Sequence, residues 1–167
     1  MKDFNAYQIP KERDLRKNGV YVSTNHRGAF FLYENGMCKV LPIHPNGPEF
    51  WSDPAKGAEE VMKDGRFYSK EDWGRYVLNN NQFIIQNFNR NGESFCKRWL
   101  FEERGYIDND STIIIQVNES IESHRRDTMF AGRNVFQFYP MNIKPDSTVA
   151  WFLNKNWYKR GMDEANL

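Results

Sequence analysis

Histidines, carboxylates and serines are the side chains of this 167-residue chain best suited to chemistry, and their spacing assembles no recognisable site. His26, His44 and His124 lie too far apart for the i,i+2 or i,i+4 pairs that bind metal ions. Glu102 and Glu103 are adjacent, so on a strand they point to opposite faces and cannot act together as acid and base. No serine lies in a G-x-S-x-G sequence. We therefore expect a protein without enzymatic activity, metal site or cofactor.

A basic cluster and two cysteines are the remaining candidates. His124-Arg125-Arg126 lies in the polar stretch ESIESHRRDTMFAGR. It either grips an anionic group on a ligand or partner, because Arg forks bind carboxylate and phosphate, or lies in a solvated loop. Cys38 and Cys96 are interpreted as two buried thiols; the alternative is a disulfide between strands, which requires an oxidising compartment.

The charge balance limits the classes of partner. Lys and Arg number 23 and Asp and Glu 22, so the net charge is +1, and we expect no nucleic-acid partner. No apolar stretch reaches the roughly 18 residues of a transmembrane helix. The start, MKDFNAYQIP, lacks the apolar core of a signal peptide. A chain complete as written is expected in the cytoplasm, and a trimmed form of a periplasmic or lipid-anchored envelope protein would read the same.

Short apolar runs separated by turn residues predict strands along most of the chain. In WGRYVLNNNQFIIQNF, residues 73–88, two such runs flank an Asn-rich turn. Asn35-Gly36 between two apolar runs predicts a hairpin with positive φ at both positions. Turns are also expected at Gly105 and over 106–110. The eight predicted strands lie near 19–24, 28–34, 37–41, 73–79, 82–89, 94–104, 111–118 and 134–140.

Two helices are predicted beside these strands. Several prolines exclude a regular strand over 42–70, where Ser52-Asp53-Pro54 can begin a helix near 53–64. Near the end, Asp146 or Ser147 can cap a last helix whose apolar face lies against the outside or the open end of the strands. That apolar face comprises Val149, Trp151, Phe152, Leu153 and Trp157.

Sequential strands with short connections predict an all-β fold, an eight-stranded up-and-down meander barrel with a short helix in the 42–70 insertion and a C-terminal helix. The length suits one domain. We place the barrel at 18–160, after a polar lead-in over 1–17 and before a tail over 161–167.

Several phrases resemble a group of small bacterial lipocalin-like (calycin-type) proteins of uncharacterised function. They are NGVYVS followed by FFLYENG, WGRY and FIIQ around a polar turn, RGYIDNDSTIII and KPDSTVAWFLNKNWY. The resemblance spans about residues 15–160 and implies an eight-stranded calycin barrel that is often exported or lipid-anchored. It carries no catalytic residue. The chain departs from that pattern in lacking a signal sequence or lipobox cysteine near its start, and in its longer 42–70 insertion.

Alternation along the strands predicts which residues line the barrel. A lining of this kind either packs solid or leaves room for one apolar ligand. Lys97 falls on the aromatic face of its strand, where it would hold an acidic head group or extend to the rim, unless a register shift near Arg98 moves it. The predicted lining residues are Tyr76, Phe83, Ile85, Phe95, Lys97, Trp99, Phe101, Ile113, Ile115, Phe136 and Phe138.

Two functions follow from these alternatives. The leading hypothesis is non-catalytic binding of a small apolar or amphipathic ligand inside the barrel, driven by burial worth about 25 cal/mol per Å² of apolar surface. The alternative is a protein–protein interaction module or homodimer with a filled core. That module would present exposed aromatic residues such as Trp51, Phe67, Tyr68 and Trp157 to its partner.

Overall fold

Strands dominate the described part of the chain. The structure, a computed structural model, describes residues 4, 15–25, 28–41, 52–63, 72–90, 98–121, 125–126 and 134–165. The strands are β1 (Gly19–Ser23), β2 (Ala29–Leu32), β3 (Met37–Leu41), β4 (Trp73–Asn79), β5 (Gln82–Arg90), β6 (Arg98–Asn109), β7 (Thr112–Ser120), β8 (Arg125–Arg126) and β9 (Asn134–Pro140). The helices are α1 (Pro54–Lys63), the 3-10 helix η3 (Ser147–Val149) and α2 (Asn156–Ala165).

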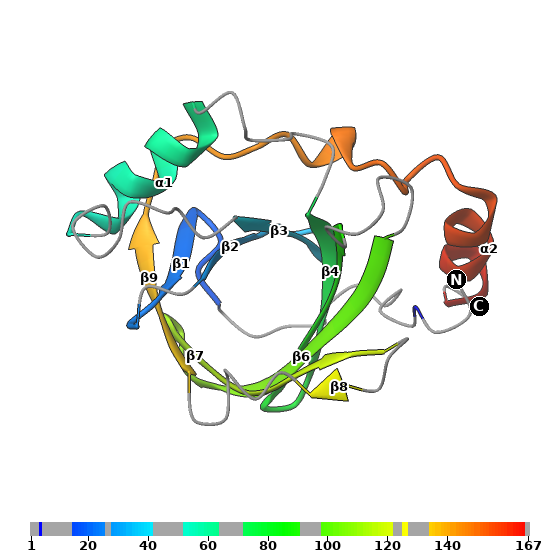
Figure 1. Ribbon diagram of the computed structural model, residues 1–167, viewed down its shortest axis with the longest axis horizontal. Coiled ribbons are helices and arrows are strands. Elements are labelled where there is room, and N and C mark those ends of the chain that lie inside the picture. The colour runs from blue at the N-terminus through cyan, green and yellow to red at the C-terminus, as the bar shows by residue number, and fades with distance from the viewer. Residues whose placement is uncertain are drawn as a thin grey trace.

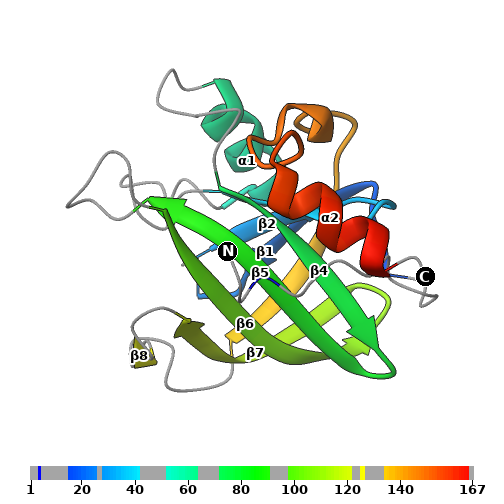
Figure 2. The same cartoon turned by 90° about the vertical axis from the view of Figure 1, so that its right-hand side faces the viewer.

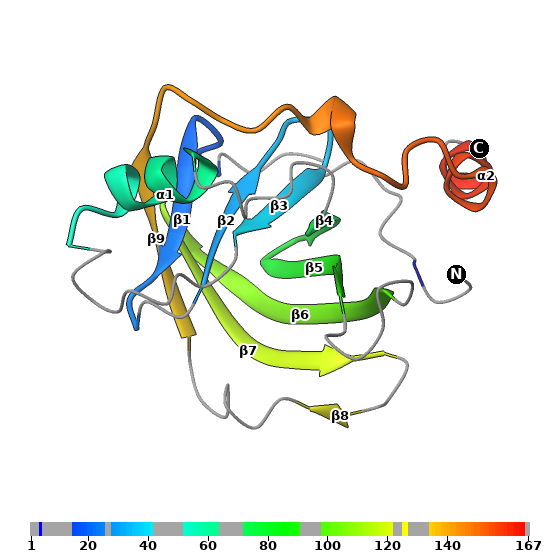
Figure 3. The ribbon, with the colours of Figure 1, turned by 45° about the horizontal axis from the view of Figure 1, so that its top comes forward.

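Eight of these strands form a closed antiparallel barrel. From β1 to β7 each main strand pairs with the next, β7 pairs with β9, and β9 pairs with β1. Figure 1 shows the resulting ring. The short β8 stands outside this circuit and pairs with the end of β7, as Figure 3 shows beyond β6 and β7. The predicted eight-stranded up-and-down barrel is therefore confirmed.

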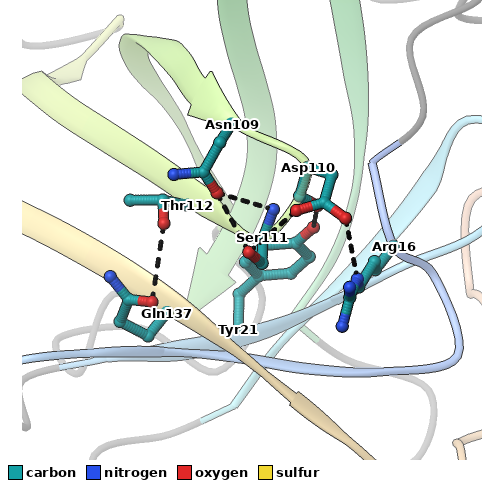
Figure 4. A network of polar contacts seen from close by, with 7 residues as sticks. All are labelled: Arg16, Tyr21, Asn109, Asp110, Ser111, Thr112 and Gln137. Carbon is teal, nitrogen blue, oxygen red and sulfur yellow. Dashed lines mark hydrogen bonds and ion pairs between the residues drawn. The ribbon is translucent and has the colours of Figure 1, made fainter.

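Leu15 and Arg16 close one end of the barrel. Leu15 is buried in the interior, and the backbone and guanidinium of Arg16 both bond Asp110 in the β6–β7 turn, the latter at 2.9 Å. The Tyr21 hydroxyl donates to the Asp110 carbonyl at 3.2 Å. Figure 4 shows this network, in which Ser111 also donates to Asn109 and Asp110. Leu15 and Arg16, assigned by composition to a polar lead-in, thus contact the barrel.

The helices cover two outer faces of the barrel. α1 lies over β1 and β9, while α2 lies on another side, across the outside of β4 (Figures 1 and 2). Arg75, buried on the outer face of β4, donates to the Tyr158 hydroxyl of α2 at 2.6 Å and to the Asn35 carbonyl at 3.0 Å. The predicted placement of the C-terminal helix against the outside of the strands is confirmed.

The start of that last helix was predicted wrongly. Asp146 does accept a hydrogen bond from the Thr148 amide, but the helix it caps is the three-residue η3. α2 begins only at Asn156. The apolar residues between the two helices pack on the outer face of the barrel with Phe4 and Phe88. Their burial comes from that contact, so it does not require a helical period.

The predicted end of β6 is also wrong. The turn expected at Gly105 and over 106–110 is a continuation of β6 as far as Asn109. The chain turns only at Asp110-Ser111. Gly105 lies where the β6 and β7 backbones approach closely beside a register shift, so its glycine signals close packing within a strand.

Other local predictions had mixed outcomes. α1 begins as predicted, with Asp53 accepting from the Lys56 amide at 3.2 Å. The β2–β3 hairpin forms, but of Asn35 and Gly36 only Gly36 has positive φ, at 76°. Arg125 and Arg126, predicted in a loop, form β8. The segments 94–97 and 64–70 lie outside the described residues.

Candidate functional site in the barrel interior

The half of the interior next to the closed end is packed with apolar side chains. Phe30 stacks with Tyr21 and Phe83, and its ring centroid lies 4.8 Å from that of Phe136. Tyr76, Phe83, Ile85 and Ile113 have no exposed surface. The other members of this interior cluster are Leu15, Leu32, Cys38, Leu78, Ile107 and Ile115, with Val40 and Phe138 packed against it. Side chains therefore fill this half.

The half next to the opposite end differs. Residues directly opposite in neighbouring strands share a face, so the pairing of Ile85 with Glu103 turns Glu103 inward. Trp99 and Phe101, at two-residue intervals on the same strand, face the same side. All three retain partial exposure, whereas Phe83 and Ile85 have none. Solvent-sized space therefore adjoins these inward-facing side chains.

Glu103 is an inward-facing, partly buried carboxylate. Burial raises its pKa from 4.5 to about 7, and a hydrogen bond from the Asn87 side chain opposes that shift. The described residues that share its face on the adjoining strands are Ile85 and Asn87 of β5 and Asn118 of β7. Across the interior is the Cys38 thiol, whose pKa is raised by burial and further by the Glu103 carboxylate. No Lys, Arg or His faces Glu103 among these described residues.

Three further inward-facing polar side chains have oxygen atoms without a partner. They are Asn118 Oδ1, Ser120 Oγ and Asn134 Oδ1. Asn118 lies opposite Glu103, Ser120 opposite Phe101, and Asn134 opposite Ile115, so all three share the inward face. Ser120 and Asn134 are each only 4% exposed. A buried oxygen that lacks a hydrogen bond is costly, so each of these atoms lowers the stability of the barrel while it has no partner.

The adjacent carboxylates separate as the sequence predicts. Glu102 lies on the outer face, where its carboxylate accepts from Gln86 at 2.6 Å and pairs with Arg104 at 3.2 Å. Arg104 also bonds Glu119 of β7 at 2.8 Å. Glu103 has none of these partners because it points the other way, so the two carboxylates do not form an acid–base pair.

Most of the predicted lining lies inside the barrel. Tyr76, Phe83, Ile85, Ile113, Ile115 and Phe136 belong to the packed interior cluster, Phe138 packs against it, and Trp99 and Phe101 line the roomier half. Phe95 and Lys97 lie outside the described residues. Sequence reasoning missed the polar members, above all Glu103 and Asn118. Glu103 has the same parity as Trp99 and Phe101, which was the signal available.

Other reactive groups give no second centre of this kind. Within the described residues no three His, Cys, Asp or Glu side chains come together as metal ligands, and no helix is long and apolar enough to cross a membrane. All three histidines lie outside those residues. Cys38 is a buried free thiol, and Cys96 lies outside the described part.

A pocket of 590 Å³ lies on the outside, bordered by Lys17, Tyr33, Glu34 and Lys144 among others. The Lys144 ammonium already donates to the carbonyls of Lys17 and Leu32, both at 2.6 Å, and Lys17 pairs with Glu34. Burial lowers the pKa of Lys144 to about 8. Lys17 and Lys144, the two cations at this pocket, are thus already bonded to other groups of the protein. Three inward-facing oxygens of the barrel, in contrast, have no partner.

The raised pKa of Glu103 predicts a stability difference that depends on pH. Between pH 4.5 and about 7 the folded protein holds a proton that the unfolded chain has lost, so this group costs stability as pH rises and the cost is complete above about 7. Glu103→Gln removes that cost. Because the side chain keeps some solvent contact, we expect a gain of only about 1–2 kcal/mol at high pH.

Urea unfolding of wild type and Glu103→Gln across this pH range measures the difference. The free energy of unfolding of the variant should exceed that of wild type above about pH 7 and should be nearly equal to it at pH 4.5. A difference that does not change with pH would show that the pKa of Glu103 is not raised by burial.

Comparisons of the chain with protein-family models, with curated proteins and with solved structures found no significant match. The structure defines its class as a closed eight-stranded antiparallel barrel with an apolar interior cluster.

Proposed function

We propose that this protein binds a small apolar or amphipathic molecule inside its barrel, without catalysing a reaction on it. The observation that carries the proposal is the residual exposure of Trp99 and Phe101 on the inward face, next to a fully packed aromatic cluster. Eight-stranded barrels have an interior just wide enough to be filled or to hold one small ligand. The resemblance to lipocalin-like proteins belongs to this proposal and supports it.

The alternative, an interaction module with a filled core, has less support. Trp157, one of the aromatics that this module would expose, is partly buried and packs against Phe88 and Trp151. Trp51, Phe67 and Tyr68 lie outside the described residues. A filled core would also leave the inward-facing oxygens without partners, and each such atom lowers the stability of the protein.

Fluorescence titration with the neutral dye Nile red tests the proposal. We expect saturable binding to the wild type. Phe101→Trp adds bulk within the roomier half and should weaken binding about tenfold, since overpacking costs roughly 1–3 kcal/mol.

Tyr106→Trp is the matched control. Tyr106 lies on the same strand and pairs with Gln82 and Ile114, on the outward face. This variant adds the same kind of bulk outside the barrel and should bind the dye like wild type. Absence of wild-type binding, or equal loss in both variants, would contradict binding in the interior.

A further inference from the structure

Several inward-facing polar side chains of the barrel have oxygen atoms without a hydrogen-bond donor. Glu103 carries a carboxylate, and the oxygens without partners are Asn118 Oδ1, Ser120 Oγ and Asn134 Oδ1. Residues 99–103 bring Trp99 and Phe101 to the same inward face. The Glu103 carboxylate accepts a hydrogen bond from Asn87 and lies on the same face as these two rings, and its charge is not balanced by a cation among the described inward-facing residues.

We propose that the bound molecule is an amphipathic amine, whose protonated head group pairs with Glu103 and donates to Asn118 while its apolar body lies against Trp99 and Phe101. This inference rests on the proposed function and specifies its ligand. An ammonium group has three donors and no acceptor, and its charge is opposite to that of the Glu103 carboxylate. Aromatic faces attract cations as well, most strongly when water is excluded.

The register places these groups close enough to act on one head group. Glu103 and Asn118 are directly opposite in the β6–β7 pair, where Cβ atoms are typically about 5 Å apart. Phe101 is two residues from Glu103, about 7 Å along the strand, and is flanked by Asn87 and Ser120. An ammonium between the carboxylate and the ring would touch both.

The charge of Glu103 favours a head group opposite in sign to the one that Lys97 suggested. That residue suggested an acidic head group, because it has the same strand parity as Trp99. The described interior offers a carboxylate there. A ligand carboxylate would meet Glu103 as a like charge, and like charges brought together in a site disfavour binding.

Three probes of equal chain length separate a basic, a neutral and an acidic head group: decylamine, decanol and decanoate. Each is titrated calorimetrically into the intact protein at about pH 8. At this pH Glu103 is mostly ionised and the amine is protonated. We expect decylamine to bind about tenfold or more tighter than decanol, as a charge-assisted hydrogen bond predicts, and decanoate to bind weakest. Glu103→Gln should remove the advantage of decylamine over decanol and leave decanol affinity nearly unchanged. Glu102→Gln, on the outward face, is the matched control and should keep the wild-type order.

The outcomes distinguish a failure of the amine proposal from a failure of the proposed binding function. Decanol binding with no preference for the amine would overturn the amine proposal and leave interior binding standing. A preference for decanoate would overturn it in favour of an acidic head group. No binding of any probe would overturn both. The wild-type order of the three probes decides the question even if a variant folds poorly.

Discussion

Phe83→Ala is expected to destabilise the protein by about 3–5 kcal/mol, as large-to-small changes of buried aromatic residues do. Phe83 has no exposed surface and contacts the rings of Phe30 and Tyr76, with centroids 6.0 Å away in each case. These neighbours are themselves fixed in a closed ring of strands, so they cannot collapse into the space left. The change should lower the midpoint of urea unfolding without changing its slope.

Phe101→Ala tests the other half by the same measurement. Phe101 faces inward but is partly exposed, so its replacement removes less buried apolar surface than Phe83→Ala does. We therefore expect a loss of about 1–2 kcal/mol in the free energy of unfolding. Its larger effect should be on ligand binding. Equal stability costs for the two variants would mean that the barrel is filled from end to end, and the binding proposal would lose its premise.

Gly105→Ala is expected to be nearly as severe, at roughly 3–5 kcal/mol, in the range reserved for strain and severe overpacking. A Cβ added at Gly105 would lie 1.8 Å from the carbonyl oxygen of Ile114 and 2.8 Å from the Cα of Ile115. Both contacts are backbone atoms of β7, the partner that closes the barrel at this seam. Relief therefore requires β6 and β7 to move apart and lose ladder hydrogen bonds.

Gly28→Ala is the control for Gly105→Ala. The nearest atom to an added Cβ at Gly28 is a ring carbon of Phe136 at 3.7 Å, an ordinary contact. We expect an effect within about 1 kcal/mol, with a slight gain from reduced freedom of the unfolded chain. If the two alanine variants unfold at the same urea concentration, the close approach of β6 and β7 at Gly105 is not as described.

Local sequence signals predicted the strands well where turn chemistry and alternation agree. β3, β4 and β9 have the predicted bounds, and β5 differs by one residue. They did less well where one residue type serves two purposes. Glycine marks turns and also close backbone approaches, so Gly105 was read as the end of a strand that continues to Asn109. Apolar residues mark helix faces and also any surface that is covered, so Trp151 to Leu153 were placed in a helix that begins later.

The candidate site shows the same division. Parity along 99–103 could have placed Glu103 beside Trp99 and Phe101, but a charged residue is ordinarily assigned to the solvent face because burial of a charge is costly. Asn118, Ser120 and Asn134 come from strands whose inward faces depend on a register shift in β7 and on where β9 begins. Neither feature has a local signature in the sequence.

Local patterns in the sequence predict an all-β chain of hairpins, because alternation and turn residues act over a few positions. Tertiary structure decided which strands close the ring, that Leu15 and Arg16 close one end, and that one half packs solid while the other keeps a carboxylate and bare acceptors inside. Closure depends on register between strands distant in the chain, and a shift of one residue exchanges the two faces. The environment of Glu103, from which the proposed ligand class follows, therefore exists only in the assembled barrel.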